Sequence, residues 1–136
     1  MNIYAENRKA IFNYEVLEKY EAGMVLIGQE VKSIRSGRVN LAGSYVIIRN
    51  GEPELIGTKI PPYQAKNAPE DYNSERTRKL LLNKKEVNYL AGKANEKGFS
   101  LIPLKVYDKG GRIKLEFGVA RGKKKYDKRE KIKKRD

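Results

Sequence analysis

Apolar and polar residues alternate along much of the chain, which is the pattern of β-strands that bury one face. The first such stretch covers residues 12–27 and bends at Gly23. A second stretch, residues 45–49, is followed by Asn50-Gly51 and then by residues 52–60. Asn-Gly readily supplies the positive φ angles of a type I′ turn. We therefore predict a long bent strand and then a hairpin.

A second hairpin is predicted nearer the C-terminus. Residues 99–107 and 112–120 alternate in the same way and are joined by the turn residues Asp108 to Gly111. Pro103 falls inside the first of these strands, although proline cannot donate a hydrogen bond to a neighbouring strand. This strand is therefore expected to be an edge strand or to contain a bulge.

Two stretches follow the helical period instead. In residues 83–98 the opening Asn83 and the later Glu86 form a variant of the capping box. The face expected to pack on the strands carries Val87, Leu90, Ala91 and Ala94. A shorter helix fits residues 29–36, and residues 61–74, with three prolines, read as a loop. Three strands, a helix and two strands is the order of an OB-type closed antiparallel β-barrel, so the predicted fold is mainly β with flanking helices.

The charge is concentrated at one end of the chain. The 136 residues carry a net charge of +13, and the last sixteen residues hold ten cations against three acids. That segment has too few apolar residues to offset its ordering entropy. We predict an OB-like RNA-binding barrel over residues 1–120 and a basic tail over 121–136 that is disordered when free.

Composition narrows the function. The chain has no cysteine and no histidine, which removes thiolate chemistry, the commonest general acid/base and the commonest zinc ligand. We therefore expect no cofactor, no metal and no enzymatic activity. No signal peptide or membrane segment is evident, so we expect a cytoplasmic protein. Such a positive charge indicates nucleic acid or an anionic membrane surface as the partner. A membrane binder is expected to carry a basic amphipathic helix with bulky apolar residues opposite the charge, and none is evident, so we expect nucleic acid and no membrane.

Several residues are candidates for RNA contact, and each also has a plainer reading. Asn7-Arg8-Lys9 is a short basic arm or a frayed terminus. Lys32 and Arg35 lie one turn apart on the short helix and could contact phosphates or simply face water. In the segment Arg76 to Leu82, which includes Lys79, an alternating strand turns Leu81 outward beside cations, unless a bulge buries it.

Two further candidates depend on hydrogen bonding and stacking. Glu21, at the predicted bend, can accept hydrogen bonds from base amino and imino groups, whereas a solvated strand end is the plainer reading. Tyr126 stands alone among the cations of the tail, where it could stack on a base. The plainer reading of the tail is a solubilising segment.

Taken together, these segments resemble the small protein B (SmpB) family, the tmRNA-binding proteins of bacterial trans-translation. The resemblance runs from residue 7 to residue 135. It rests on Asn7 to Ala10, Glu21-Ala22-Gly23, Glu30 to Arg35, Asn40, Ser44-Tyr45, Arg76 to Leu82, Pro103-Leu104, Gly122-Lys123-Lys124 and Asp127-Lys128-Arg129.

The resemblance implies an OB-like barrel that holds the tRNA-like domain of tmRNA (SsrA RNA). It implies ribosome rescue, with charging by alanyl-tRNA synthetase and delivery by elongation factor Tu to stalled ribosomes. It also implies a tail that enters the decoding centre and mRNA channel. The family's tail usually runs further than Asp136. We expect a monomer.

The family's tmRNA-binding residues match this chain at Asn7, Glu21, Leu81 and Lys114. Arg8, Lys32, Arg35 and Lys79 complete the predicted tmRNA-binding set. The predicted ribosome-binding residues of the tail are Gly122, Lys123, Lys124, Tyr126, Asp127, Lys128 and Arg129, although family members differ at the position of Tyr126.

The residues leave other classes of function open. A general single-strand nucleic-acid-binding chaperone on the same OB fold needs the charge and the aromatics but not Glu21 or the Leu81 pattern. A ribosomal structural protein is a third reading. An enzyme is the weakest reading, because no acid/base pair is evident.

Overall fold

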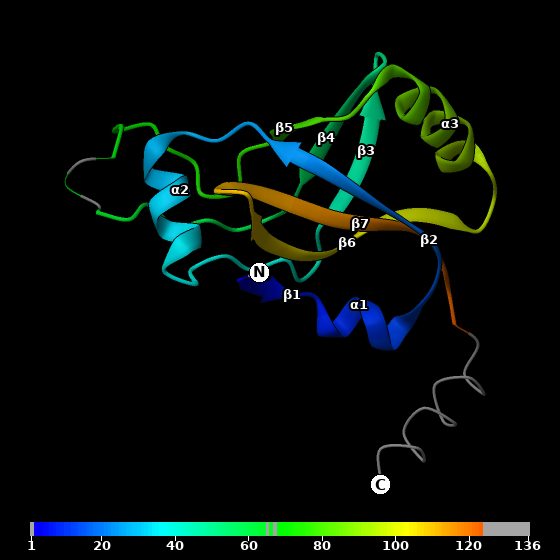
Figure 1. Ribbon diagram of the computed structural model, residues 1–136, viewed down its shortest axis with the longest axis horizontal. Helices are drawn as coiled ribbons and strands as arrows, with labels where there is room; N and C mark the ends of the chain where they lie inside the picture. Colours follow the sequence, from blue (N-terminus) through cyan, green and yellow to red (C-terminus); the bar gives the residue numbers. More distant parts are fainter. Residues whose placement is uncertain (1, 65, 67, 124–136) are drawn as a thin grey trace, which may run out of the picture.

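The computed structural model describes residues 2–64, 66 and 68–123, and these form a mainly antiparallel β-sheet with a few helices (Figure 1). In chain order the elements are β1 (Ile3–Glu6), α1 (Arg8–Asn13), β2 (Tyr14–Met24), α2 (Gly28–Arg35), β3 (Tyr45–Arg49), β4 (Glu52–Ile56), β5 (Arg78–Leu81), α3 (Lys84–Asn95), β6 (Phe99–Lys109) and β7 (Arg112–Gly122).

Each strand pairs antiparallel with its neighbours in the order β1-β6-β3-β4-β5-β2-β7, and β6 also pairs with β7. In Figure 1, α2 and α3 lie at opposite ends of the strands, and α1 lies below them. Strands β2 and β7 pair from Tyr14 opposite Gly122 to Gly23 opposite Lys114. This long pairing, together with that of β6 and β7, forms the platform for the candidate site.

The interior is apolar and lies between the strands, α2 and α3. Its fully buried members include Ile34 of α2, Leu90 of α3 and Phe117 of β7. A smaller apolar cluster, with Ala10 and Leu104, lies under α1. Among the described residues, no helix combines the length and the apolar character needed to cross a membrane.

The two hairpins are confirmed, but β4 ends at Ile56 rather than at residue 60, because Gly57 takes a positive φ angle of 79°. Asn50 and Gly51 have φ angles of 51° and 76°, as a type I′ turn requires. In the second hairpin the strands continue to Lys109 and Arg112, so Gly110-Gly111 alone makes the turn. The pairing of β6 with β7 shifts register after Pro103, which confirms the bulge rather than an edge strand.

Both predicted helices are present, with one correction. Asn83 caps α3 by accepting from the Glu86 amide at 2.8 Å, and the Glu86 side chain accepts in return from the Asn83 amide. Val87 and Leu90 are buried as predicted. Ala94 was expected to face the strands but is exposed, and α3 ends at Asn95 rather than near residue 98.

The N-terminal region was predicted wrongly. The residues interpreted as a basic arm are the cap and the first turn of α1. The long strand runs from Tyr14 to Met24 rather than from residue 12 to residue 27, because residues 12 and 13 belong to α1 and Ile27 caps α2. A strand, β1, precedes that helix and pairs with β6. At the other end, β7 runs to Gly122, two residues past the boundary predicted at residue 120. Tail residues 124–136 lie outside the described residues.

Candidate nucleic-acid interface

A row of paired residues crosses four neighbouring strands and places Leu81 on the surface. Gly23 of β2 pairs with Leu81 of β5 on one side and with Lys114 of β7 on the other. Lys114 in turn pairs with Tyr107 of β6. Side chains directly opposite one another on antiparallel strands point to the same face. Because Leu81 is 62% exposed whereas Leu80 is 4% exposed, the predicted outward leucine is confirmed.

Gly23 makes room for this leucine. A Cβ atom at Gly23 would lie 3.3 Å from both Cβ and Cδ1 of Leu81, which is tighter than an ordinary van der Waals contact. The leucine side chain therefore lies directly over the glycine backbone. The result is a flat apolar surface of the kind that packs on an unstacked base.

A groove of about 340 Å³ adjoins this surface, between the C-terminal half of α2 and the ends of β2, β5 and β7. Its apolar lining and cationic rim suit a base or ribose with its phosphate. Three predicted RNA-binding residues, Arg35, Leu81 and Lys114, meet here. The full lining is Gly23, Met24, Leu26, Val31, Arg35, Leu81, Gly111, Arg112, Ile113 and Lys114.

Glu21 lies two residues before Gly23 on β2, so its side chain is on the same face as Leu81. The Tyr107 hydroxyl donates a hydrogen bond to Glu21 Oε2, and Lys109 Nζ lies 3.3 Å from the same oxygen. The hydrogen bond from Tyr107, assisted by Lys109 and Lys114 against partial burial, lowers the pKa of the Glu21 carboxyl. Glu21 is thus an ionised acceptor at neutral pH.

Two cations of this face, Arg35 and Lys79, form exposed ion pairs with neighbouring carboxylates. Arg35 donates to the Gly111 carbonyl at 2.9 Å and lies 3.8 Å from Asp108, and its side chain is 47% exposed. Lys79, on the same face of β5 as Leu81, lies 3.7 Å from Glu52 and is 65% exposed. Exposed pairs of this kind contribute little to stability. Both cations can therefore turn to phosphates, as can Lys32 on the exposed side of α2.

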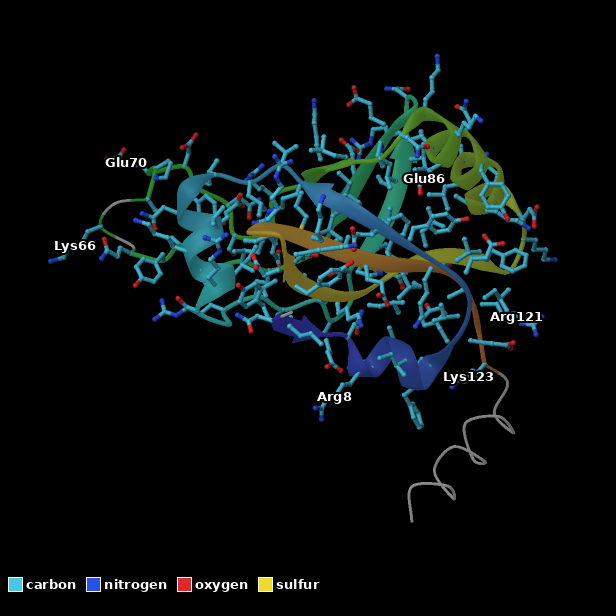
Figure 2. The ribbon with its side chains drawn as sticks, viewed as in Figure 1. Arg8, Lys66, Glu70, Glu86, Arg121 and Lys123 are labelled. Carbon is cyan, nitrogen blue, oxygen red and sulfur yellow. The ribbon has the colours of Figure 1, made fainter. Side chains whose placement is uncertain are left out.

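A second group of predicted residues lies around α1. Figure 2 shows Arg8 of α1 and Lys123, which follows β7, on the same side of the molecule. The Lys123 amide donates to the Asn13 carbonyl at 2.9 Å, and Lys123 Nζ donates to the Ile11 carbonyl at 3.2 Å. Gly122 pairs with Tyr14. The start of the predicted tail is thus fixed against α1.

Asn7 has a structural role in the protein. The residue is 5% exposed, and its side chain caps α1 by accepting from the Ala10 amide at 3.2 Å and donates to the Pro103 carbonyl at 2.9 Å. These bonds position α1, and the predicted contact of Asn7 with RNA stays a prediction. The tail residues Lys124, Tyr126, Asp127, Lys128 and Arg129 lie outside the described residues.

Sequence reasoning missed a buried ion cluster that holds α2 in place. Glu30 and Arg78 both have fully buried side chains, and Arg78 Nη2 lies 2.7 Å from Glu30 Oε2. Arg76 donates to the same carboxylate through Nε at 2.9 Å, and so does the Tyr72 hydroxyl at 3.1 Å. Two of the three cations that precede Leu80 are therefore paired with Glu30, Arg78 with a fully buried side chain and Arg76 with a side chain that is 32% exposed.

The ionisation of Glu30 follows from these partners. Burial raises the pKa of its carboxyl, but bonds from Arg76, the Ile27 amide and Arg78 more than offset this, so the pKa lies below its ordinary value. The Ile27 bond, at 3.0 Å, also satisfies a backbone donor at the start of α2. The cluster thus fixes the helix that carries Val31 and Arg35 to the groove.

The chain is similar to known proteins over nearly its whole length. The family model for SmpB protein matches residues 4–136. An SsrA-binding protein of Carboxydothermus hydrogenoformans is 54% identical, and the match covers 98% of this chain and 89% of the relative. An SsrA-binding protein of Thermosynechococcus vestitus is 50% identical, with 99% of this chain and 89% of the relative covered.

A solved structure has a similar fold. This structure, "tmRNA-SmpB: a journey to the center of the bacterial ribosome", contains a chain that is 42% identical to this one. The two chains have a TM-score of 0.74, and the match covers 97% of this chain and 95% of the other. The family model spans more than half of this chain, and the relatives align over almost all of it. The chain therefore belongs to the SmpB family.

Proposed function

We propose that this protein binds the tRNA-like domain of tmRNA and delivers tmRNA to stalled ribosomes for trans-translation. The single observation that carries the proposal is membership of the SmpB family over residues 4–136. The relatives named as SsrA-binding proteins and the tmRNA-SmpB structure agree with it. The function would be exercised in the cytoplasm, and the RNA-binding role requires no catalysis by the protein.

The geometry supports RNA binding at the surface around Leu81. The exposed Leu81 over Gly23 offers a surface for an unstacked base, and the ionised Glu21 offers an acceptor for base N–H groups. Lys114 and Arg35 border the groove and supply positive charge for the backbone. A general single-strand binder needs the charge and the aromatics, whereas an acceptor beside a leucine favours one folded RNA over others.

We further propose a closed barrel as the fold and several partners for the bound tmRNA. The continuous series of strand pairings, rejoined by β6 and β7, supports a closed, OB-like barrel as the platform. We expect the protein to act as a monomer. Alanyl-tRNA synthetase would charge the bound tmRNA, and elongation factor Tu would carry it. Residues from Gly122 onward would occupy the decoding centre and mRNA channel.

A reconstituted rescue reaction tests this function. Ribosomes stalled at the end of a truncated message are given alanyl-tmRNA with and without the full chain, and transfer of the nascent peptide to alanine is measured. We expect transfer only when the protein is present. Equal transfer without the protein would contradict the proposal. Ordinary alanyl-tRNA serves as the control substrate, because it should not respond to the protein.

A further inference from the structure

Tyr107 is a buried residue whose hydroxyl reaches the candidate interface. The residue is 3% exposed, and its hydroxyl donates to Glu21 Oε2 across the platform, from β6 to β2. Burial raises the pKa of this hydroxyl and the Glu21 carboxylate raises it further, so the group remains a protonated donor at neutral pH. The tyrosine ring itself is too buried to contact RNA broadly.

We propose that Tyr107 is a positioning residue for RNA selection, because its hydroxyl holds Glu21 Oε2 and leaves Oε1 to accept hydrogen bonds from the N–H groups of an unpaired base. This inference rests on the proposed function, since it concerns the same surface. The described partners of Oε1 support it. Among the described residues, Lys109 Nζ, at 3.4 Å, is the one hydrogen-bond partner of Oε1, and the Glu21 side chain is 35% exposed.

The physical reason is preorganisation. A free glutamate on a strand samples several rotamers, and fixing one of them on binding costs free energy. The hydrogen bond from Tyr107 fixes the rotamer in advance and keeps the carboxylate ionised. Lys109 cannot replace it, because its ammonium lies on a flexible, 61% exposed side chain. Removing the hydroxyl should therefore weaken recognition by the carboxylate without removing any direct contact with RNA.

The same protein supplies a matched control. Tyr89 of α3 donates its hydroxyl to Glu18 Oε2 at 2.7 Å, which is the same pairing of groups on another element. Glu18 lies three residues before Glu21 on β2, so its side chain leaves the strand on the face opposite to that of Glu21 and Leu81. Tyr89→Phe thus removes a tyrosine–glutamate bond of the same kind without touching the Leu81 surface.

A double-mutant cycle tests the inference. Affinities for the tRNA-like fragment of tmRNA and for ordinary tRNA are measured at one salt concentration for the wild type, Tyr107→Phe, Glu21→Ala and the double variant. Tyr107→Phe should lower the preference for the fragment by about threefold to tenfold, whereas in the Glu21→Ala background it should change it by less than about twofold, because coupled residues are not additive. Tyr89→Phe should leave the preference unchanged.

The other outcomes distinguish a wrong positioning role for Tyr107 from a wrong proposed function. If Glu21→Ala lowers the preference but Tyr107→Phe does not, the positioning role is wrong and the proposed function stands. An equal loss from Tyr107→Phe in both backgrounds would show a purely structural tyrosine and overturn the inference. A wild-type protein with no preference would overturn the proposed function, and the inference with it.

A second readout needs no RNA. The pKa of the Glu21 carboxyl can be followed by NMR in the free protein, where the charged and titratable neighbours are Tyr107 and Lys109 of β6, Lys114 and Glu116 of β7, and Lys19 of β2. We expect Tyr107→Phe to raise this pKa and Tyr89→Phe to leave it in place. An unchanged pKa in Tyr107→Phe would contradict the inference.

Discussion

Replacing Glu30 with alanine removes the centre of the buried ion cluster. The substitution leaves the Arg78 guanidinium inside the protein with a fully buried side chain and no carboxylate to balance its charge. It also removes the acceptor for Arg76 and for the Ile27 amide. The substitution therefore tests whether this cluster holds α2 against the strands.

The magnitude follows from the geometry. Removing one partner of a buried ion pair typically costs about 3–5 kcal/mol, because the other charge remains buried. Arg78 keeps hydrogen bonds to the Thr58 carbonyl at 2.6 Å and the Ser74 carbonyl at 2.9 Å. These bonds satisfy the donors but not the charge, so we expect a loss of about 3 kcal/mol.

Urea unfolding at pH 7 measures the effect. With a slope of about 2 kcal/mol per molar, which is ordinary for a domain of this size, the midpoint should fall by about 1.5 M. The control is Glu75→Ala, which removes an exposed carboxylate 3.9 Å from Lys59 and should cost less than about 0.5 kcal/mol. If Glu30→Ala lowered stability no more than this control, the structural role of the cluster would be refuted.

Four further predictions concern the surface, the salt dependence, the pH dependence and the tail. Leu81→Ala should lower the preference for the tRNA-like fragment with less than about 0.5 kcal/mol of lost stability, whereas Leu80→Ala, at a buried position, should cost about 2–5 kcal/mol in urea unfolding. Lys79→Ala should weaken binding to all RNAs and reduce the slope of log K against log salt by about 0.7–0.9, with the fragment preference retained. Because the pKa of Glu30 is lowered in the folded state, its stabilisation is present above its unfolded pKa, near 4.3, and is lost as the pH falls through the folded value. Urea unfolding at falling pH should therefore show a steeper loss of stability for the wild type than for Glu30→Ala. Deleting residues 126–136 should leave fragment affinity within about tenfold, or about 1.4 kcal/mol, while abolishing peptide transfer on stalled ribosomes, and loss of both activities would place the tail in the tmRNA site.

Local signals in the sequence predicted the local features. Asn50-Gly51 predicted a hairpin because few other residues adopt positive φ angles, and the structure places both residues there. Asn83 and Glu86 predicted the start of α3 through the capping box. The exposure of Leu81 followed from strand alternation alone. Each of these signals acts over only a few neighbouring residues.

Long-range and very short features could not be predicted in this way. Glu30 and Arg78 are 48 residues apart, and Tyr107 and Glu21 are 86 residues apart, so no periodicity links them. The pattern of the segment from Arg76 to Leu82 therefore gives no sign that Arg76 and Arg78 pair with Glu30. Helix α1 has only six residues, too few for an amphipathic pattern to emerge. The capping role of Asn7 became evident only from its buried hydrogen bonds.

The most direct test of the account compares two RNAs on one protein. Affinities of the full chain for the tRNA-like fragment of tmRNA and for ordinary tRNA are measured at the same salt concentration, and the comparison is repeated with Glu21→Ala. We predict that the wild type binds the fragment more tightly and that Glu21→Ala loses much of this preference. Equal affinity of the wild type for both RNAs, or tighter binding of the fragment by Glu21→Ala, would contradict the account.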